Sequence, residues 1–192
     1  MKKAIISLAF GAALLSPVAS AHAFEGVYLA PEIGYGSLKI KLETDSGDFS
    51  DSKGGVSYGL IGGYRFETGN WVLGIEGRVG KTDANGTFLG VEEKAGREFT
   101  ISGLVGYDLG GAWTIFATLG YDNLKFTESF MGVTASDTTD GAAVSLGAEY
   151  DISSSVALRG TLTGVAYTRT IGPDYKIKPT QSRGTVSAVF HF

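Results

Sequence analysis

The sequence Trp71-Val72-Leu73-Gly74-Ile75-Glu76-Gly77-Arg78-Val79 decides the fold. Every second residue from Trp71 onward is apolar or glycine, whereas the alternate positions include Glu76 and Arg78. A period of two is typical of a β-strand, because successive side chains point to opposite faces of the sheet. The stretch therefore predicts a strand with one apolar face and one face that carries charge.

The same alternation recurs along most of the chain. It is found in the segments 27–35, 58–66, 99–107, 113–121, 142–150, 156–167 and 184–192. Pro31 interrupts the first of these segments, and proline is disfavoured inside a regular ladder. Together with 71–79 they predict eight strands of roughly nine to eleven residues, a length that suits a tilted membrane crossing.

Short and long connections alternate between the predicted strands. The short ones lie near 67–70, 108–111 and 151–155, and the long polar ones near 37–56, 80–96, 122–140 and 168–182. Outer-membrane barrels have short periplasmic turns and longer extracellular loops. The pattern predicts an all-β fold, an eight-stranded antiparallel up-and-down transmembrane β-barrel with short periplasmic turns and four long extracellular loops.

Composition and charge exclude several other classes of protein. The chain has 192 residues, of which 29 are glycine and none is cysteine, and its formal net charge is −4. Without cysteine there is no disulfide scaffold, thiolate metal site or thiol nucleophile. The acidic balance argues against nucleic acid as a partner, because phosphate binding needs clustered lysine and arginine.

The first 23 residues predict a secretory signal peptide. Lys2 and Lys3 precede an apolar stretch from Ala4 to about Val18, and Ala21-His22-Ala23 follows as a small-x-small cleavage site. The apolar stretch is shorter than the roughly 20 residues that a membrane-spanning helix requires. We therefore expect residues 1–23 to be the signal peptide and residues 24–192 to form the barrel domain.

Aromatic residues stand at both ends of the apolar faces. A soluble sandwich or lipocalin-like barrel also alternates, but its apolar face points inward and gives no reason for aromatic residues at both edges. Aromatic rings are stable at the two membrane–water interfaces. The predicted girdle contains Phe66, Trp71, Tyr107, Trp113 and Tyr150 at the short connections, and Tyr35, Tyr58, Phe99 and Tyr121 at the long ones.

If the apolar faces meet lipid, the polar faces fill the lumen of the barrel. Eight strands leave an interior that side chains can fill, and isolated buried charges are costly, so the inward acids and bases should pair. We expect a stacked ionic network, with an ion or proton path as the alternative role. Its predicted members are Arg65, Glu149 and Arg159 toward the short turns, Glu76 near the middle, and Glu32, Arg78 and Glu98 higher.

The sequence contains no recognisable catalytic or metal-binding motif. His191 is the one histidine after the predicted cleavage site, and it lies at the short-turn end, whereas a Ser-His-Asp site acting on outer-leaflet lipid needs histidine at the other end. The acidic segment 45–52 resembles a calcium loop but lacks the ligand spacing and terminal glutamate of an EF-hand. We therefore predict no cofactor and no enzymatic activity.

From Phe24 onward the chain resembles the small eight-stranded outer-membrane barrels, a family that includes the transmembrane domain of OmpA, the OmpX and Ail type and opacity-like porins. The resemblance rests on the opening strand 24–28, on the pairs Gly63-Tyr64 and Gly106-Tyr107, and on the last strand, 184–192. It implies a protein of the bacterial cell outer membrane, surrounded by outer-membrane lipid and lipopolysaccharide. It also implies delivery by periplasmic chaperones to the barrel assembly machinery. The residues that resemble the terminal signal read by that machinery are Gly184, Val186, Ala188, Phe190 and Phe192.

The resemblance also implies a non-enzymatic function. Such proteins are envelope components that present surface loops for adhesion or for binding a host molecule or another ligand. The alternatives are a small porin-like or hydrophobic-compound channel and, third, a lipid-modifying enzyme.

Overall fold

The computed structural model describes residues 25–44, 47–83, 85–88, 91–130, 133–167, 169–171 and 175–192, so the predicted signal peptide lies outside the described residues. None of the described residues forms a helix long and apolar enough to cross a membrane. The barrel strands are β1 (Gly26–Thr44), β2 (Gly47–Thr68), β3 (Trp71–Thr82), β5 (Val91–Asp108), β6 (Trp113–Phe130), β7 (Val133–Asp151), β8 (Val156–Tyr167) and β10 (Tyr175–His191). Two short strands, β4 (Asn85–Phe88) and β9 (Arg169–Ile171), pair with β5 and β10.

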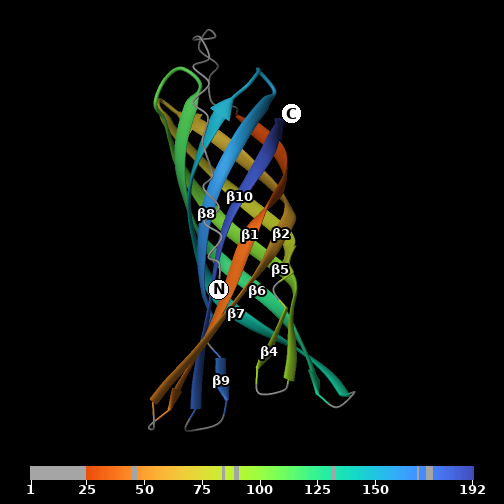
Figure 1. The fold of residues 1–192 in the computed structure, drawn as a ribbon. Coiled ribbons are helices and arrows are strands. Elements are labelled where there is room, and N and C mark those ends of the chain that lie inside the picture. The colour runs from red at the N-terminus through yellow and green to blue at the C-terminus, as the bar shows by residue number, and fades with distance from the viewer. Residues whose placement is uncertain are drawn as a thin grey trace, which may run out of the picture.

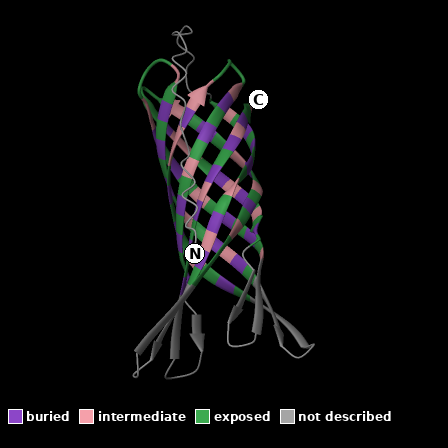
Figure 2. Ribbon diagram, in the orientation of Figure 1, coloured by how far each residue is buried: buried purple, intermediate pink, exposed green. Residues whose placement is uncertain are grey.

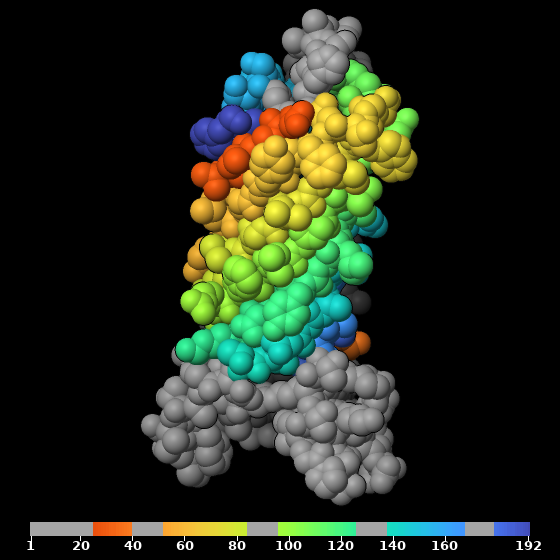
Figure 3. All heavy atoms as spheres, turned by 180° about the vertical axis from the view of Figure 1, so that it is seen from behind, coloured from red at the N-terminus to blue at the C-terminus, as the bar shows by residue number. Residues whose placement is uncertain are grey.

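The eight long strands close into one antiparallel barrel, as the sequence predicts. Their order is β1-β2-β3-β5-β6-β7-β8-β10, and β1 pairs with β10 to complete the ring. Figure 1 shows these strands wrapping obliquely around a tall cylinder, and Figure 3 shows the side chains of neighbouring strands as oblique bands across the back face. Each strand therefore contacts its sequence neighbours, and the closing seam joins the first strand to the last.

Short turns define one end of the barrel, which we call the short-turn end. Gly69, Gly110 and Gly111 all have positive φ angles there, between 63° and 82°, a conformation that glycine adopts without a steric cost. The backbone amide of Gly110 donates a hydrogen bond to Asp108 Oδ1 at 2.8 Å, which stabilises the turn between β5 and β6.

The long connections at the opposite end, which we call the hairpin end, are built largely of paired strand. The β1–β2 ladder continues to Thr44 opposite Gly47, and the β6–β7 ladder continues to Phe130 opposite Val133. The sequence predicts polar loops here because the apolar alternation stops. Backbone pairing does not require an apolar face, so the hairpins extend past the segment whose side chains alternate.

The apolar face of the barrel points outward. Leu119 is 68% exposed and Leu162 72% exposed, whereas Arg65 is 2% and Arg159 1% exposed. Buried and exposed residues alternate along every strand of the barrel wall (Figure 2). A soluble barrel has the reverse arrangement, so the prediction of a membrane barrel is confirmed and the soluble alternative is wrong.

Glycine allows the strands to approach one another around the filled interior. A Cβ atom at Gly34 would collide with the carbonyl oxygen of Gly184 on β10, and a Cβ atom at Gly120 would collide with that of Ile101 on β5. Both glycines lie on the inward face of their strands. Their lack of a side chain leaves the interior to larger residues of neighbouring strands.

Candidate functional site: the ionic interior of the barrel

The first group of charged side chains lies toward the short-turn end, and we call it the turn-side cluster: Tyr28, Arg65, Glu76, Glu149 and Arg159. Arg65 donates two hydrogen bonds to Glu149, from Nη1 to Oε2 at 2.8 Å and from Nη2 to Oε1 at 2.7 Å. Arg159 Nε donates to Glu149 Oε1 at 2.6 Å, and its Nη1 donates to Glu76 Oε1 at 2.7 Å. The hydroxyl of Tyr28 also donates to Glu76. Bidentate pairs of this kind are among the strongest polar contacts in proteins.

Aromatic rings support the arginines of the turn-side cluster. The guanidinium carbon of Arg65 lies 4.3 Å from the centroid of the Tyr28 ring, and that of Arg159 lies 4.9 Å from the centroid of Phe116. Both distances allow cation–π attraction. The two rings therefore occupy part of the lumen beside the ion pairs.

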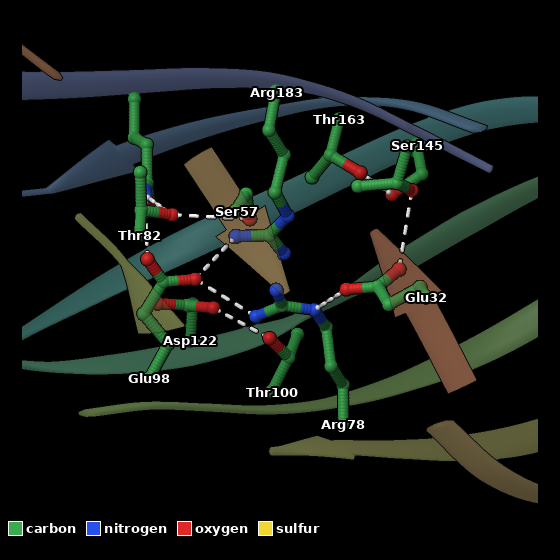
Figure 4. Close-up of polar contacts among 12 residues, drawn as sticks. Glu32, Ser57, Arg78, Thr82, Glu98, Thr100, Asp122, Ser145, Thr163 and Arg183 are labelled. Carbon is green, nitrogen blue, oxygen red and sulfur yellow. Dashed lines mark hydrogen bonds and ion pairs between the residues drawn. The ribbon is translucent and has the colours of Figure 1, made fainter. Parts of the chain in front are cut away.

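The second group lies toward the hairpin end, and we call it the hairpin-side cluster: Glu32, Arg78, Glu98, Gln181 and Arg183. Arg78 Nε donates to Glu32 Oε1 at 2.5 Å, and Arg78 Nη1 donates to Glu98 Oε2 at 2.8 Å. Glu98 Oε2 also accepts from Arg183 Nη1 at 2.7 Å, and Glu98 Oε1 accepts from Gln181 Nε2 at 2.6 Å. Figure 4 shows Arg78 and Arg183 reaching Glu98 from different strands.

Asp122 carries the polar interior further toward the hairpin end. Its Oδ2 accepts a hydrogen bond from Thr100 Oγ1 at 2.6 Å. Its Oδ1 lies 2.8 Å from the hydroxyl of Tyr167. Asp122 and Tyr167 are both almost fully buried. The polar interior is therefore continuous from β5 across β6 to β8 at this height.

A small cavity lies where the two clusters meet. It has a volume of about 30 Å³ and is lined by members of both, among them Glu76, Arg78 and Arg159. Arg78 Nη2, Arg159 Nη2 and the hydroxyl of Thr161 are buried without a hydrogen-bond partner among the described residues, and all three residues line the cavity. A volume of this size holds roughly two water molecules. It is too small for a larger solute.

The structure brings all seven sequence-predicted lumen residues into the interior and places them in the two clusters. Arg65, Glu149, Arg159 and Glu76 belong to the turn-side cluster, and Glu32, Arg78 and Glu98 belong to the hairpin-side cluster. The sequence analysis missed five further members or neighbours of this network: Tyr28, Asp122, Tyr167, Gln181 and Arg183.

Arg183 and Asp122 were missed because they stand at the ends of the alternating segments. The alternation places Gln181 in a long polar connection and predicts that the last strand begins at Gly184. Arg183 nevertheless continues the polar side of β10, two residues before the buried Thr185. Extending the period of two past each predicted boundary would have found both charged residues.

The predicted aromatic girdle residues lie on the outer surface at the two ends of the apolar band. Seven of the nine are exposed, and these are Tyr35, Tyr58, Phe66, Trp71, Phe99, Trp113 and Tyr121. Tyr107 and Tyr150 are half-buried because each packs against a tryptophan, with ring centroids 5.1 Å apart for Trp71–Tyr107 and 4.9 Å apart for Trp113–Tyr150. Both tryptophan pairs lie at the short-turn end.

The C-terminal strand presents the predicted assembly residues on the outer surface. Val186, Phe190 and Phe192 are exposed there, and Gly184 and Ala188 are half-buried. The amide of Phe192 donates to the carbonyl of Val27 at 3.0 Å. The ring of His191 points inward beside Tyr28, with centroids 5.8 Å apart. The last residue thus takes part in the seam between β10 and β1.

Asp151, where β7 meets its short turn, has a markedly altered pKa. Partial burial, together with the negative charge of Glu149, raises the pKa of Asp151 to about 6. Within the described ranges, no three histidine, aspartate or glutamate side chains gather in a way that could hold a metal ion.

Comparison with known proteins identifies the kind of barrel. The sequence profile of the family described as "Outer membrane protein beta-barrel domain" matches residues 6–190. The 22 kDa outer membrane protein of Rhizobium leguminosarum bv. viciae is 30% identical over 107 residues, which make up 55% of this chain and 46% of that protein. The matched region therefore spans just under half the length of this curated relative.

Solved structures with the same fold include Neisserial surface protein A. It is 13% identical, with 88% of this chain and 98% of that chain covered and a TM-score of 0.56. The outer membrane protease OmpT from Escherichia coli is 8% identical, with 87% and 97% covered and a TM-score of 0.52. At these identities the likeness concerns the fold alone.

Proposed function

The chain belongs to the family of outer membrane protein β-barrel domains and lies in the bacterial outer membrane, and from this premise we propose that it is a non-enzymatic envelope protein. Its sealed barrel anchors four surface hairpins that serve adhesion or the binding of a host molecule or another ligand. The hairpins connect β1–β2, β3–β5, β6–β7 and β8–β10. In this family the short turns face the periplasm, so the hairpins face the outside of the cell.

The observation that supports this proposal is the presence of two layers of ion pairs across the lumen. Glu149 links Arg65 of β2 to Arg159 of β8, and Glu98 links Arg78 of β3 to Arg183 of β10. Each layer spans strands on different sides of the barrel, and the space where the layers meet is about 30 Å³. This arrangement supports a plug and weighs against the alternative of a small porin-like or hydrophobic-compound channel.

The proposal also covers export and assembly of the barrel. Residues 1–23 direct export as a signal peptide, and periplasmic chaperones pass the unfolded chain to the barrel assembly machinery. The machinery reads Gly184, Val186, Ala188, Phe190 and Phe192 on the last strand. Outer-membrane lipid and lipopolysaccharide then surround the aromatic girdle, and the ion pairs form as the strands close.

Hairpin trimming tests the proposed role directly. Ile40 pairs with Asp51 and Phe126 pairs with Asp137, so replacing residues 41–50 and 127–136 each by Asn-Gly keeps the register of the barrel. Cells that display either the full or the trimmed barrel are compared for binding to immobilised extracellular-matrix proteins and glycans. Heat-modifiable gel mobility confirms equal amounts of folded barrel.

We expect the full barrel to increase cell binding and the trimmed barrel, which lacks two of the four hairpins, to increase it less. Equal binding by cells with the full barrel, the trimmed barrel and no barrel contradicts the surface role. Loss of the folded form in the trimmed variant is resolved by trimming one hairpin at a time.

A further inference from the structure

Three basic side chains lie next to one another on the outer wall. They are on the hairpin side of the aromatic residues of the hairpin end. They are Lys81 on β3, Arg97 on β5 and Lys125 on β6, and all three are exposed. Lys81 and Arg97 are direct cross-strand partners. Lys125 reaches the same place from the other side, because its carbonyl oxygen would lie 2.6 Å from a Cβ atom on Gly96. We call these three residues the outer basic patch.

The arrangement of the outer basic patch is unfavourable for the protein alone. Like charges directly opposite each other on neighbouring strands destabilise a sheet. Lys81 has an ion pair with Asp83 at 2.8 Å, but both side chains are nearly half exposed and such pairs contribute little. Among the described residues, neither Arg97 nor Lys125 has an acidic partner. An anion placed between these cations would offset their repulsion.

The backbone at Arg97 is irregular. The register between β5 and β6 shifts between Ala95 and Glu98, whereas the rest of this ladder down to the turn is regular. A bulge of this kind bends the strand and redirects side chains, and bulges are frequent at the rims of barrels and next to active sites. Here the irregular segment carries Arg97 outward while Glu98 points into the hairpin-side cluster.

From the outer basic patch toward mid-membrane, the outer surface changes from aromatic to aliphatic. Tyr58 is the cross-strand neighbour of Lys81, and Phe99 follows Arg97 on the same face of β5. Ile101 and Leu119 lie deeper and are exposed to the surrounding lipid. Basic, aromatic and aliphatic side chains thus succeed one another from rim to mid-membrane, in the order that suits headgroup phosphate, interface and acyl chain.

Two acidic groups near the patch, Asp83 and Asp140, are already engaged. Asp83 pairs with Lys81, and Asp140 on β7 accepts hydrogen bonds from the Tyr121 hydroxyl at 2.5 Å and from Asn123 Nδ2 at 2.7 Å. Arg97 and Lys125 therefore supply the positive charge that can meet a ligand. A guanidinium also binds phosphate through two parallel hydrogen bonds.

We propose that Lys81, Arg97 and Lys125 form a binding site for a phosphate group of outer-leaflet lipopolysaccharide. The phosphate of its lipid anchor lies against Arg97 and Lys125, and its acyl chains lie along Phe99, Ile101 and Leu119. The site lies on the barrel wall at the base of the hairpins, outside the segments 41–50 and 127–136 that the trimming removes. Its loss therefore leaves adhesion testable.

Native mass spectrometry of the folded barrel in detergent, titrated with phosphorylated lipid A, tests the site. The variant Arg97→Gln/Lys125→Gln removes both available cations and keeps the Lys81–Asp83 pair. We expect its affinity for lipid A to fall about twenty-five-fold, because each basic residue near a membrane surface contributes about a five-fold factor in anionic-lipid binding. Lys39→Gln is the matched control, since Lys39 is an exposed base on β1, away from the patch.

Three results support the proposal together: a loss in the double variant, unchanged binding in Lys39→Gln, and equal, weak binding of dephosphorylated lipid A by all forms. An equal loss in Lys39→Gln overturns the site, because it shows a general effect of charge. Equally tight binding of phosphatidylglycerol by the wild type overturns the assignment to lipopolysaccharide. If the double variant shows no heat-modifiable folded form, the two single variants, each expected to lose about five-fold, take its place.

Discussion

Arg159 stands directly opposite Glu149 on the neighbouring strands β8 and β7, and its Nε donates a hydrogen bond to Glu149 Oε1 at 2.6 Å. The same carboxylate is held from across the lumen by Arg65 of β2. One glutamate thus connects a local cross-strand pair to a strand on another side of the barrel. A shift of β8 by one residue would turn Arg159 toward lipid, so the pair also stabilises one register.

Replacing Glu149 by glutamine removes the charge that two buried arginines share. We expect Glu149→Gln to lower the free energy of unfolding by about 3–5 kcal/mol, because it leaves buried cations without compensation. Urea unfolding in lipid vesicles, followed by tryptophan fluorescence, measures the change. Glu25→Gln, at an exposed position before β1, is the control and should leave the free energy of unfolding unchanged. Equal stability of both variants would show that the pairs do not hold the barrel together.

The outward direction of the apolar face predicts a depth-dependent cost of charge. Leu119→Arg places a cation on the lipid-facing side near mid-membrane and should destabilise the barrel by about 2–4 kcal/mol. Leu109→Arg, in the short turn after β5, lies at the rim and should cost about 0–1 kcal/mol. The same unfolding assay compares them. Similar costs at both depths would mean that Leu119 does not face hydrocarbon.

The raised pKa of Asp151 predicts a pH-dependent gain in the variant Asp151→Asn. The folded-state pKa is about 6 and the ordinary value is 3.8, so the unfolded chain ionises first as the pH rises. The free energy of unfolding of the wild type therefore decreases as the pH rises from 3.8 to about 6, and the full decrease is present above pH 6. We expect Asp151→Asn to be more stable than wild type at neutral pH and equal to it below the lower value. A gain that does not change with pH would contradict ionisation as its cause.

Phe192 has an exposed ring and a backbone hydrogen bond to Val27, and substitutions can separate the roles of the two. Phe192→Ala removes the exposed ring but keeps the backbone hydrogen bond to Val27, whereas deletion of Phe192 removes both. If the ring is read by the assembly machinery, both variants accumulate as precursor in the periplasm, which pulse-chase labelling and fractionation measure. Phe192→Trp, the aromatic control, should assemble normally. Normal assembly of Phe192→Ala would assign the terminal residue to the seam alone.

The fold could be predicted because the period of two extends over whole strands. Leu119 and Thr118 are neighbours in sequence and face opposite media, and this contrast recurs in every strand of the wall. The pairing of charges could not be predicted. Arg65 and Glu149 are 84 residues apart and lie on strands that are not neighbours, so their contact depends on the tilt and closure of the barrel.

The ends of the strands were harder to predict than their middles. Beyond the membrane both faces of a hairpin meet water, so polarity no longer distinguishes them, and the ladder continues without an apolar signal. Arg183 and Asp122 lie at this transition, where the interior is still closed but the outer face is already polar. The sequence therefore predicted a plug of charged side chains but not how far the plug extends toward the hairpin end.

Planar-bilayer recording of the purified barrel tests the sealed lumen most directly. The turn-side and hairpin-side clusters together predict no steady open-channel current after the barrel inserts into the bilayer. Heat-modifiable gel mobility of the recovered protein verifies that the inserted barrel is folded. Steady, large currents from the inserted wild-type barrel would contradict the account.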